Sequence, residues 1–220
     1  MKNIDLGEIK RYLKYDSETL DKVTEKNIKR ALEIVAKMAD FKYLYRKYSI
    51  VVTDKQVDIK DANLIFESIS LANHLKKCDE AVLFIATLGL TLDKEIERLE
   101  VIDLALAYAV NAVAVAYLEE AIDETLVDID TSKNQTSRYS IGYGDLELKY
   151  QNDLINILDA SKQIGVYALE THLMVPAKTV SAIVGLSFEM VNSDLKKCDN
   201  CLTNGKCSGR CLEELEYGYK

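Results

Sequence analysis

The chain has 220 residues, enough for one substantial hydrophobic core, and its 48% hydrophobic content excludes pervasive disorder. Its net charge of −8 excludes a dedicated nucleic-acid-binding protein, because no basic surface is available to displace counterions from phosphates. The N-terminus lacks an apolar segment of signal-peptide length, so we expect a cytoplasmic protein.

Helical and strand patterns follow one another in the first half of the chain. Apolar residues recur at helical spacing between Leu20 and Met38, whereas the segment 42–52 is rich in tyrosine and β-branched residues, which favour strands. In chain order, the predicted elements are a helix over residues 5–14, a helix from the cap residues Asp16 and Ser17 to about Ala39, a strand or hairpin over 42–59, a helix over 68–77 and a buried strand over 81–88.

The longest apolar segment, residues 102–118, is rich in alanine, which lets neighbouring elements approach a helix closely. It is short for a membrane span, and it contains Asp103 and Asn111. We therefore expect a long buried central helix and no membrane insertion.

After this helix, the sequence predicts a turn, a helix over 148–158 and two strands, 164–169 and 179–187, on either side of Pro176. The elements lack a regular βαβ order, which favours an α+β fold over a doubly wound sheet. We expect a mixed or antiparallel sheet surrounded by helices. The expected boundaries are residues 1–190 for a single domain and 191–220 for a short Cys-rich C-terminal tail.

The segment 138–151 combines a lone arginine, two glycines, a tyrosine and an acid. Gly142 and Gly144 permit positive φ or close approach to a ligand, and Tyr143 lies between them. Arg138 is four residues upstream and could bind a carboxylate through two parallel N–H donors. The pattern fits either a surface turn or a ligand-binding turn, and the spacing alone leaves both open.

Four of the five cysteines lie close together at the C-terminus. Four thiolates at such spacing could hold zinc in tetrahedral geometry or an iron–sulfur cluster, and neighbouring lysines favour the thiolate form. A reduced tail without metal and a disulfide framework are the alternatives. The candidate ligands are Cys198, Cys201, Cys207 and Cys211.

No set of serine, histidine and aspartate indicates nucleophilic catalysis, and no P-loop or complete dinucleotide fingerprint occurs. His74 and His172 are the only histidines, and we expect both to be structural. Cys78 is isolated and is expected to pack in the core.

Three segments together resemble the activation (reactivation) domain of cobalamin (vitamin B12)-dependent methionine synthase in its free-standing form. They are RYSIGYGDLELKYQ at 138–151, ETHLMVPAKTVSAIVG at 170–185 and ATLG at 86–89. The similarity spans most of the first 190 residues and leaves out the cysteine tail. It implies a C-shaped α+β body that binds S-adenosylmethionine in a shallow groove and presents it to a corrinoid on another module.

The resemblance also implies roles for individual residues. The family turn reads R-x-x-x-G-Y-P, and Arg138, Gly142 and Tyr143 match it. It implies that Arg138 binds the methionyl carboxylate, that Ser140 falls where main-chain groups contact the ligand, and that Tyr143 lies toward the corrinoid or the adenosyl group. Gly144 stands in place of the family's proline.

Val184 falls where the long enzyme has a tyrosine that touches the ligand. No Asp-x-His-x-x-Gly pattern occurs, so the corrinoid is expected on a partner: the cobalamin-binding module of methionine synthase or another corrinoid protein. The resemblance further implies an electron donor such as a flavodoxin. We expect an accessory part of this methyltransferase system in methionine biosynthesis rather than a complete enzyme. The alternatives are a redox activator of another corrinoid methyltransferase that uses a metal or cluster at the tail, and a non-enzymatic binding or regulatory module.

Overall fold

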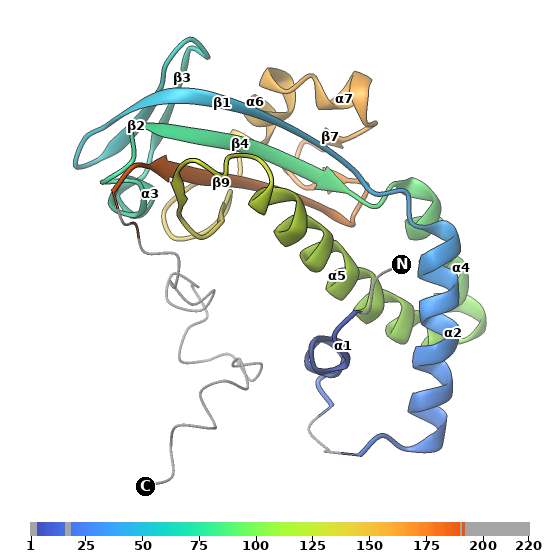
Figure 1. The fold of residues 1–220 in the computed structure, drawn as a ribbon. Coiled ribbons are helices and arrows are strands. Elements are labelled where there is room, and N and C mark those ends of the chain that lie inside the picture. The colour runs from blue at the N-terminus through green and yellow to red at the C-terminus, as the bar shows by residue number, and fades with distance from the viewer. Residues whose placement is uncertain (1–3, 16–18, 190, 192–220) are drawn as a thin grey trace, which may run out of the picture.

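A computed structural model describes residues 4–15, 19–189 and 191 of the chain. Figure 1 shows a twisted sheet at one end and a group of helices that descends from it, which gives this part of the chain a bent outline. Over these residues the fold is α+β, with seven helices, an antiparallel sheet and a long buried central helix. The fold class predicted from the sequence is confirmed.

The chain begins with the helices α1 (Leu6–Tyr12) and α2 (Lys22–Met38). The predicted cap residues Asp16 and Ser17 lie outside the described residues, but α2 begins only after Asp21, so the predicted start is wrong. The Asp21 carboxylate accepts the N–H groups of Val23 at 2.9 Å and Thr24 at 3.0 Å. These are donors that the first turn of a helix leaves without a backbone partner, so Asp21 fixes where α2 starts.

Seven strands form the main sheet in the order β3-β2-β1-β4-β9-β5, and β6 also pairs with β9. Every pairing is antiparallel. The predicted strand at 179–187 is confirmed with the same bounds, and the predicted hairpin at 42–59 is β1 with β2. The strands are β1 (Lys42–Val52), β2 (Gln56–Ile59), β3 (Leu64–Glu67), β4 (Glu80–Thr87), β5 (Asn134–Gln135), β6 (Tyr139–Ser140) and β9 (Thr179–Ser187).

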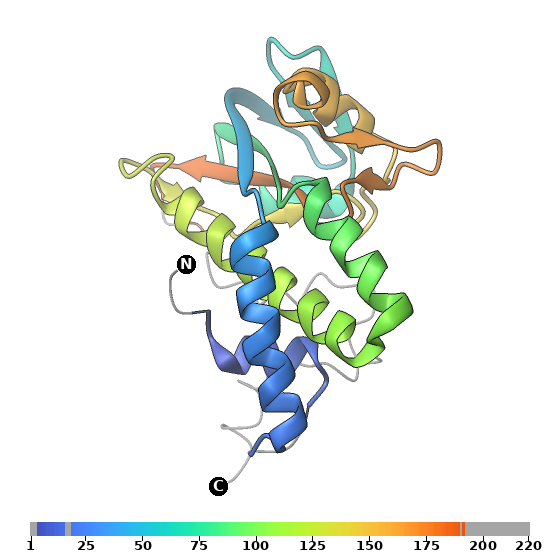
Figure 2. The ribbon, with the colours of Figure 1, turned by 90° about the vertical axis from the view of Figure 1, so that its right-hand side faces the viewer.

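Helices α3 (Ile69–His74), α4 (Leu90–Ile102) and α5 (Leu104–Val127) come next. The predicted central helix corresponds to α5, but it starts after Asp103, whose carboxylate accepts the N–H of Leu106 at 3.1 Å. By length and composition α5 could cross a membrane, yet its most apolar window is 56% buried inside the protein. It packs against α1, α2 and α4 and passes under the sheet (Figures 1 and 2).

Each face of the sheet is covered by its own hydrophobic core. Successive residues of a strand face opposite sides, so in β4 Val82 and Phe84 pack toward the helical layer of α2, α4 and α5, while Leu83 and Ile85 pack toward α3 and α6. The central strands are therefore buried on both faces, which accounts for the continuous apolar run of β4.

The last elements form a smaller layer behind the sheet (Figure 1). The predicted helix at 148–158 is confirmed as α6, whereas the predicted strand at 164–169 is reduced to two residues that pair with a second short strand in a separate sheet. The peptide bond between Val175 and Pro176 is cis and leads into β9. These elements are α6 (Tyr150–Ile157), α7 (Ala160–Gln163), β7 (Tyr167–Ala168) and β8 (Met174–Val175).

Candidate functional site

The segment 138–151, called here the arginine turn, begins on the edge of the sheet. In β6, Tyr139 lies opposite Ile183 of β9 and Ser140 lies opposite Ala182. Tyr139 is 1% exposed and belongs to the core shared with α3 and α6. Because side chains alternate along an extended segment, Arg138 and Ser140 are directed to the opposite face, where α5 lies.

Arg138 forms two ion pairs with α5. Its Nη2 lies 2.6 Å from Glu119 Oε2 and 2.9 Å from Asp123 Oδ1. The two acids are four residues apart and so share one face of the helix. The Arg138 side chain is only 12% exposed. One cation is thus held against two carboxylates where the sheet edge meets α5.

Tyr12 of α1 borders this cluster. Burial and the negative charge of Glu119 raise the pKa of Tyr12, although the neighbouring Arg11 acts in the opposite direction. The guanidinium of Arg11 lies 4.2 Å from the centre of the Tyr12 ring. The acidic face of α5 therefore also influences the N-terminal helix.

Both glycines of the turn are required by the backbone. Gly142 has φ +96° and Gly144 has φ +55°. A Cβ atom at Gly142 would meet Leu148, and one at Gly144 would meet Ser70 and the Tyr139 hydroxyl, each closer than 3.0 Å. Proline cannot adopt φ +55°, so this turn differs in shape from one with proline at that position.

Tyr143 lies at the tip of this turn. It is 40% exposed, and its ring meets the ring of Tyr139 edge-on at a centroid distance of 6.2 Å. The Tyr143 N–H donates to Ser140 O at 3.1 Å, and its carbonyl accepts from the Leu146 N–H at 2.9 Å. The turn therefore presents one aromatic side chain on a backbone held by its own hydrogen bonds.

Asp145 attaches the turn to α3. Its carboxylate accepts the N–H of Ile69 at 2.8 Å, the N–H of Ser70 at 3.1 Å, and the hydroxyls of Ser68 and Ser70. Burial opposes ionisation, but these hydrogen bonds outweigh it and hold the pKa of Asp145 well below its ordinary range. The sequence gives no sign of this contact, because the partners are more than seventy residues apart.

The three segments that carry the family resemblance converge on the central strands. Ser140 lies opposite Ala182 of β9, and Val180 of β9 lies opposite Ala86 of β4. At the end of these strands the Thr179 hydroxyl donates to the Thr87 hydroxyl at 2.9 Å. Three segments that are far apart in sequence thus lie side by side in β6, β9 and β4.

Val184 is also in β9, but it is 1% exposed and packs into the core on the α5 face. Its side chain therefore stabilises the sheet. Asp93 of α4 lies near the start of β9. Its Oδ2 accepts the Ala177 N–H, and its Oδ1 is buried without a hydrogen-bond partner among the described residues.

Both histidines have structural contacts. His74 Nε2 lies 2.9 Å from the carbonyl of Ser137, its ring packs on Tyr139, and burial lowers its pKa despite that hydrogen bond. His172 Nδ1 lies 3.0 Å from the side-chain amide of Asn152. Neither histidine contacts the acids of α5 in the described structure.

Cys78 is buried, and burial raises the pKa of its thiol to about 11. It is therefore a packing residue, as expected. The tail cysteines lie outside the described residues, so a metal or cluster there stays a prediction. Within the part of the chain that the structure describes, no group of three or more His, Cys, Asp or Glu residues is arranged to hold a metal ion. The four predicted ligands concerned are Cys198, Cys201, Cys207 and Cys211.

No family model matches the sequence, and no curated protein matches it. Among solved structures, the chain is similar to the crystal structure of the MetH reactivation domain bound to AdoHcy. The TM-score is 0.61 at 16% sequence identity, and the match covers 80% of this chain and 69% of that chain. The chain therefore has the fold of the MetH reactivation domain.

Proposed function

We propose that this chain binds S-adenosylmethionine and presents its methyl group to a corrinoid on another chain, supporting the reductive remethylation of cobalamin-dependent methionine synthase. The observation that carries the proposal is the position of Arg138 between two carboxylates, where the sheet edge meets α5 in this fold. The corrinoid partner would be the cobalamin-binding module of methionine synthase or a related corrinoid protein.

The charges in this cluster match the charges of an amino acid. The methionyl end of the ligand carries a carboxylate and an ammonium group. Both ion pairs of Arg138 use Nη2, and each parallel donor pair of a guanidinium, Nε with Nη2 or Nη1 with Nη2, includes this atom. A ligand carboxylate bound through two parallel donors would therefore displace one of the two acids from Nη2. Glu119 and Asp123 then lie beside the bound carboxylate, where their oxygens can accept the ammonium group.

In this proposal the chain binds and orients the reacting groups and does not itself react. The chemistry is supplied by the methyl sulfonium of the ligand and by the corrinoid on the partner, with an electron from a donor such as a flavodoxin. Arg138 and the α5 acids would orient the methionyl end, while the exposed Tyr143 at the tip of the turn would face the adenosyl group or the corrinoid. Such positioning needs no catalytic base, which agrees with the structural contacts of both histidines.

Isothermal titration calorimetry with S-adenosylmethionine and with S-adenosylhomocysteine tests the proposal. We expect Arg138→Ala to lose about 1.5–3 kcal/mol of binding free energy, which is about 10- to 150-fold in affinity, because a charge-assisted pair is removed. The matched control is Arg98→Ala, whose ion pair with Glu95 lies on the surface of α4. Absence of binding by the wild-type chain at millimolar ligand, or equal binding by Arg138→Ala, would refute the assigned role.

The ion pairs of Arg138 also favour a second candidate, a regulatory module in which Glu119 and Asp123 occupy the arginine in place of a ligand. Glu119→Gln separates the two. If the α5 acids accept the ligand ammonium, this variant binds S-adenosylmethionine more weakly than the wild type. If they block Arg138, the same variant gains affinity.

A further inference from the structure

One side of β1 has no neighbouring strand over most of its length. Residues 42–49 pair with β4, but on the other side β2 pairs only with residues 50–52. Figure 1 shows β1 along the upper border of the sheet, with β2 and β3 gathered at its far end. The outer side of β1 from Lys42 to Tyr48, called here the open edge, is free of any strand in the described structure.

Three residues of the open edge direct their backbone N–H and C=O groups away from the sheet. Ile50 donates its N–H group to Asp79 on the β4 side, and the register from Ile50 back to Lys42 is continuous. Because backbone groups alternate between the two edges of a strand, the even-numbered residues face β4 and the odd-numbered residues face away. The N–H and C=O groups of Tyr43, Tyr45 and Lys47 therefore point outward, and no hydrogen bond to them exists in the described ranges.

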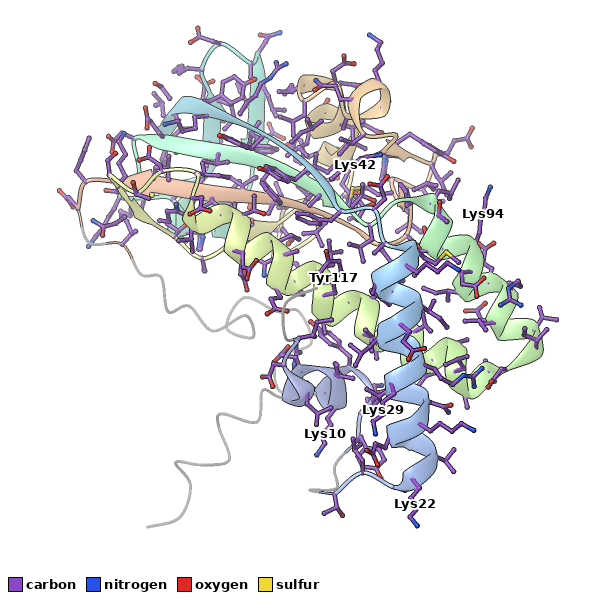
Figure 3. All side chains as sticks on the ribbon, turned by 45° about the vertical axis from the view of Figure 1, so that its right-hand side comes forward. Lys10, Lys22, Lys29, Lys42, Lys94 and Tyr117 are labelled. Carbon is purple, nitrogen blue, oxygen red and sulfur yellow. The ribbon has the colours of Figure 1, made fainter. Side chains whose placement is uncertain are left out.

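The side chains of the open edge differ between its two faces. On the α5 face, Tyr43 and Tyr45 are 43% and 41% exposed and stack on each other at a centroid distance of 6.5 Å. On the opposite face lie Lys42, at the junction of sheet and helices in Figure 3, and Arg46. Lys42 is paired with Asp40, whereas Arg46 has no ion pair among the described residues. The α5 face of the open edge thus carries the two stacked tyrosines followed by Lys47, and the opposite face carries Lys42 and Arg46 on either side of Leu44.

This distribution of charge is unusual for the chain. The protein has a net charge of −8, yet β1 contains three cations and no acid. Two of these cations pair with acids outside the strand, Lys42 with Asp40 and Lys47 with Asp130, so Arg46 is the cation without an ion pair among the described residues. Cations on an edge strand oppose pairing with a second copy of the same edge, because like charges would meet across the two strands. The same cations attract an acidic strand. Charge complementarity therefore selects an acidic occupant over a second copy.

We propose that the open edge of β1 binds an extended, acidic segment of a partner protein, which adds to the sheet as an outer strand. Main-chain hydrogen bonds to Tyr43, Tyr45 and Lys47 hold the segment, as in other recognition by strand addition. Its alternate residues are apolar against the two tyrosines and acidic against Lys42 and Arg46. This docking surface is separate from the Arg138 cluster, so it stands independently of the proposed function.

The probe is a peptide of about eight residues in which glutamate and valine alternate, compared with one in which lysine replaces glutamate. By fluorescence anisotropy, we expect the acidic peptide to bind the full chain at least about tenfold more tightly, and the binding to weaken as salt is raised. Amide hydrogen exchange by NMR gives the site. Tyr43, Tyr45 and Lys47 should exchange fast in the free chain and become protected with the peptide, whereas Leu44 and Arg46 should be protected throughout.

Two variants make the test specific. Tyr45→Pro removes an outward donor without touching the pairing with β4, so it should weaken the binding of the acidic peptide. Arg46→Glu reverses a charge but keeps the backbone, so it should abolish the preference for the acidic peptide. Lys94→Glu on α4 is the charge-matched control and should bind normally. If Tyr45→Pro does not fold, Arg46→Glu decides. Equal binding of both peptides, protection elsewhere in the chain, or a wild-type dimer in sedimentation that Tyr45→Pro dissociates would overturn the proposal.

Discussion

Removal of the Asp145 carboxylate should destabilise the whole domain, because this one side chain joins the arginine turn to α3. Asp145 accepts hydrogen bonds from two backbone N–H groups and two serine hydroxyls. Loss of an N-cap acceptor costs about 0.5–2 kcal/mol. Loss of the bonds to the serines adds about 1 kcal/mol. We therefore expect Asp145→Ala to lower the free energy of unfolding at pH 7 by about 1.5–3 kcal/mol.

The pH dependence gives a second, independent signature. The pKa of Asp145 is lower in the folded chain than in the unfolded chain, so its contribution is complete above the unfolded pKa and is lost as the pH falls toward the folded pKa. The difference in unfolding free energy between wild type and Asp145→Ala should be constant at neutral pH and should shrink below about pH 4.

Urea denaturation followed by circular dichroism measures both quantities. Asp54→Ala is the matched control, because Asp54 is exposed in the turn after β1 and forms no hydrogen bond or ion pair among the described residues. A stability of Asp145→Ala equal to that of Asp54→Ala, or a difference that stays the same from neutral pH to pH 3, would refute the reasoning.

Three further predictions concern single side chains. Gly144→Ala should lower the free energy of unfolding, measured by urea denaturation, by about 1–3 kcal/mol, which is more than Gly165→Ala. Both glycines have positive φ, but only at Gly144 would the new Cβ meet other atoms. Equal losses in the two variants would contradict this reasoning. The pKa of His74 is lowered by burial, so the folded chain should lose stability as the pH falls below about 6.5, and His74→Gln should reduce that loss in melts at pH 7 and 5. With a pKa of about 11, Cys78 should resist alkylation at pH 7 until urea is added; mass spectrometry that finds it modified in the native chain would show that it is accessible.

The sequence alone determined the elements whose apolar residues reflect their burial in the core. The apolar run of β4, the residues of β9 and the alanine-rich α5 were all predictable, since each is packed on more than one side and must be apolar throughout. The resemblance of three short segments also indicated the fold that the MetH reactivation domain shares. Less was predictable where a single capping side chain sets an element boundary, as at the start of α2, where Asp21 caps the helix.

Only the tertiary structure decided which side chains meet at the candidate site. Arg138 could be identified as an unusual cation, but its partners Glu119 and Asp123 depend on how α5 packs under the sheet. Asp145 could be noticed as an acid in the turn, yet its role arises from α3, more than seventy residues earlier. Such contacts follow from strand register and helix packing, which a local pattern of residue types does not encode. The sequence therefore specified the main helices and strands and the charged residues of the turn. The packing of β6 and β9 against α5 and α3 brought those charged residues to their partners.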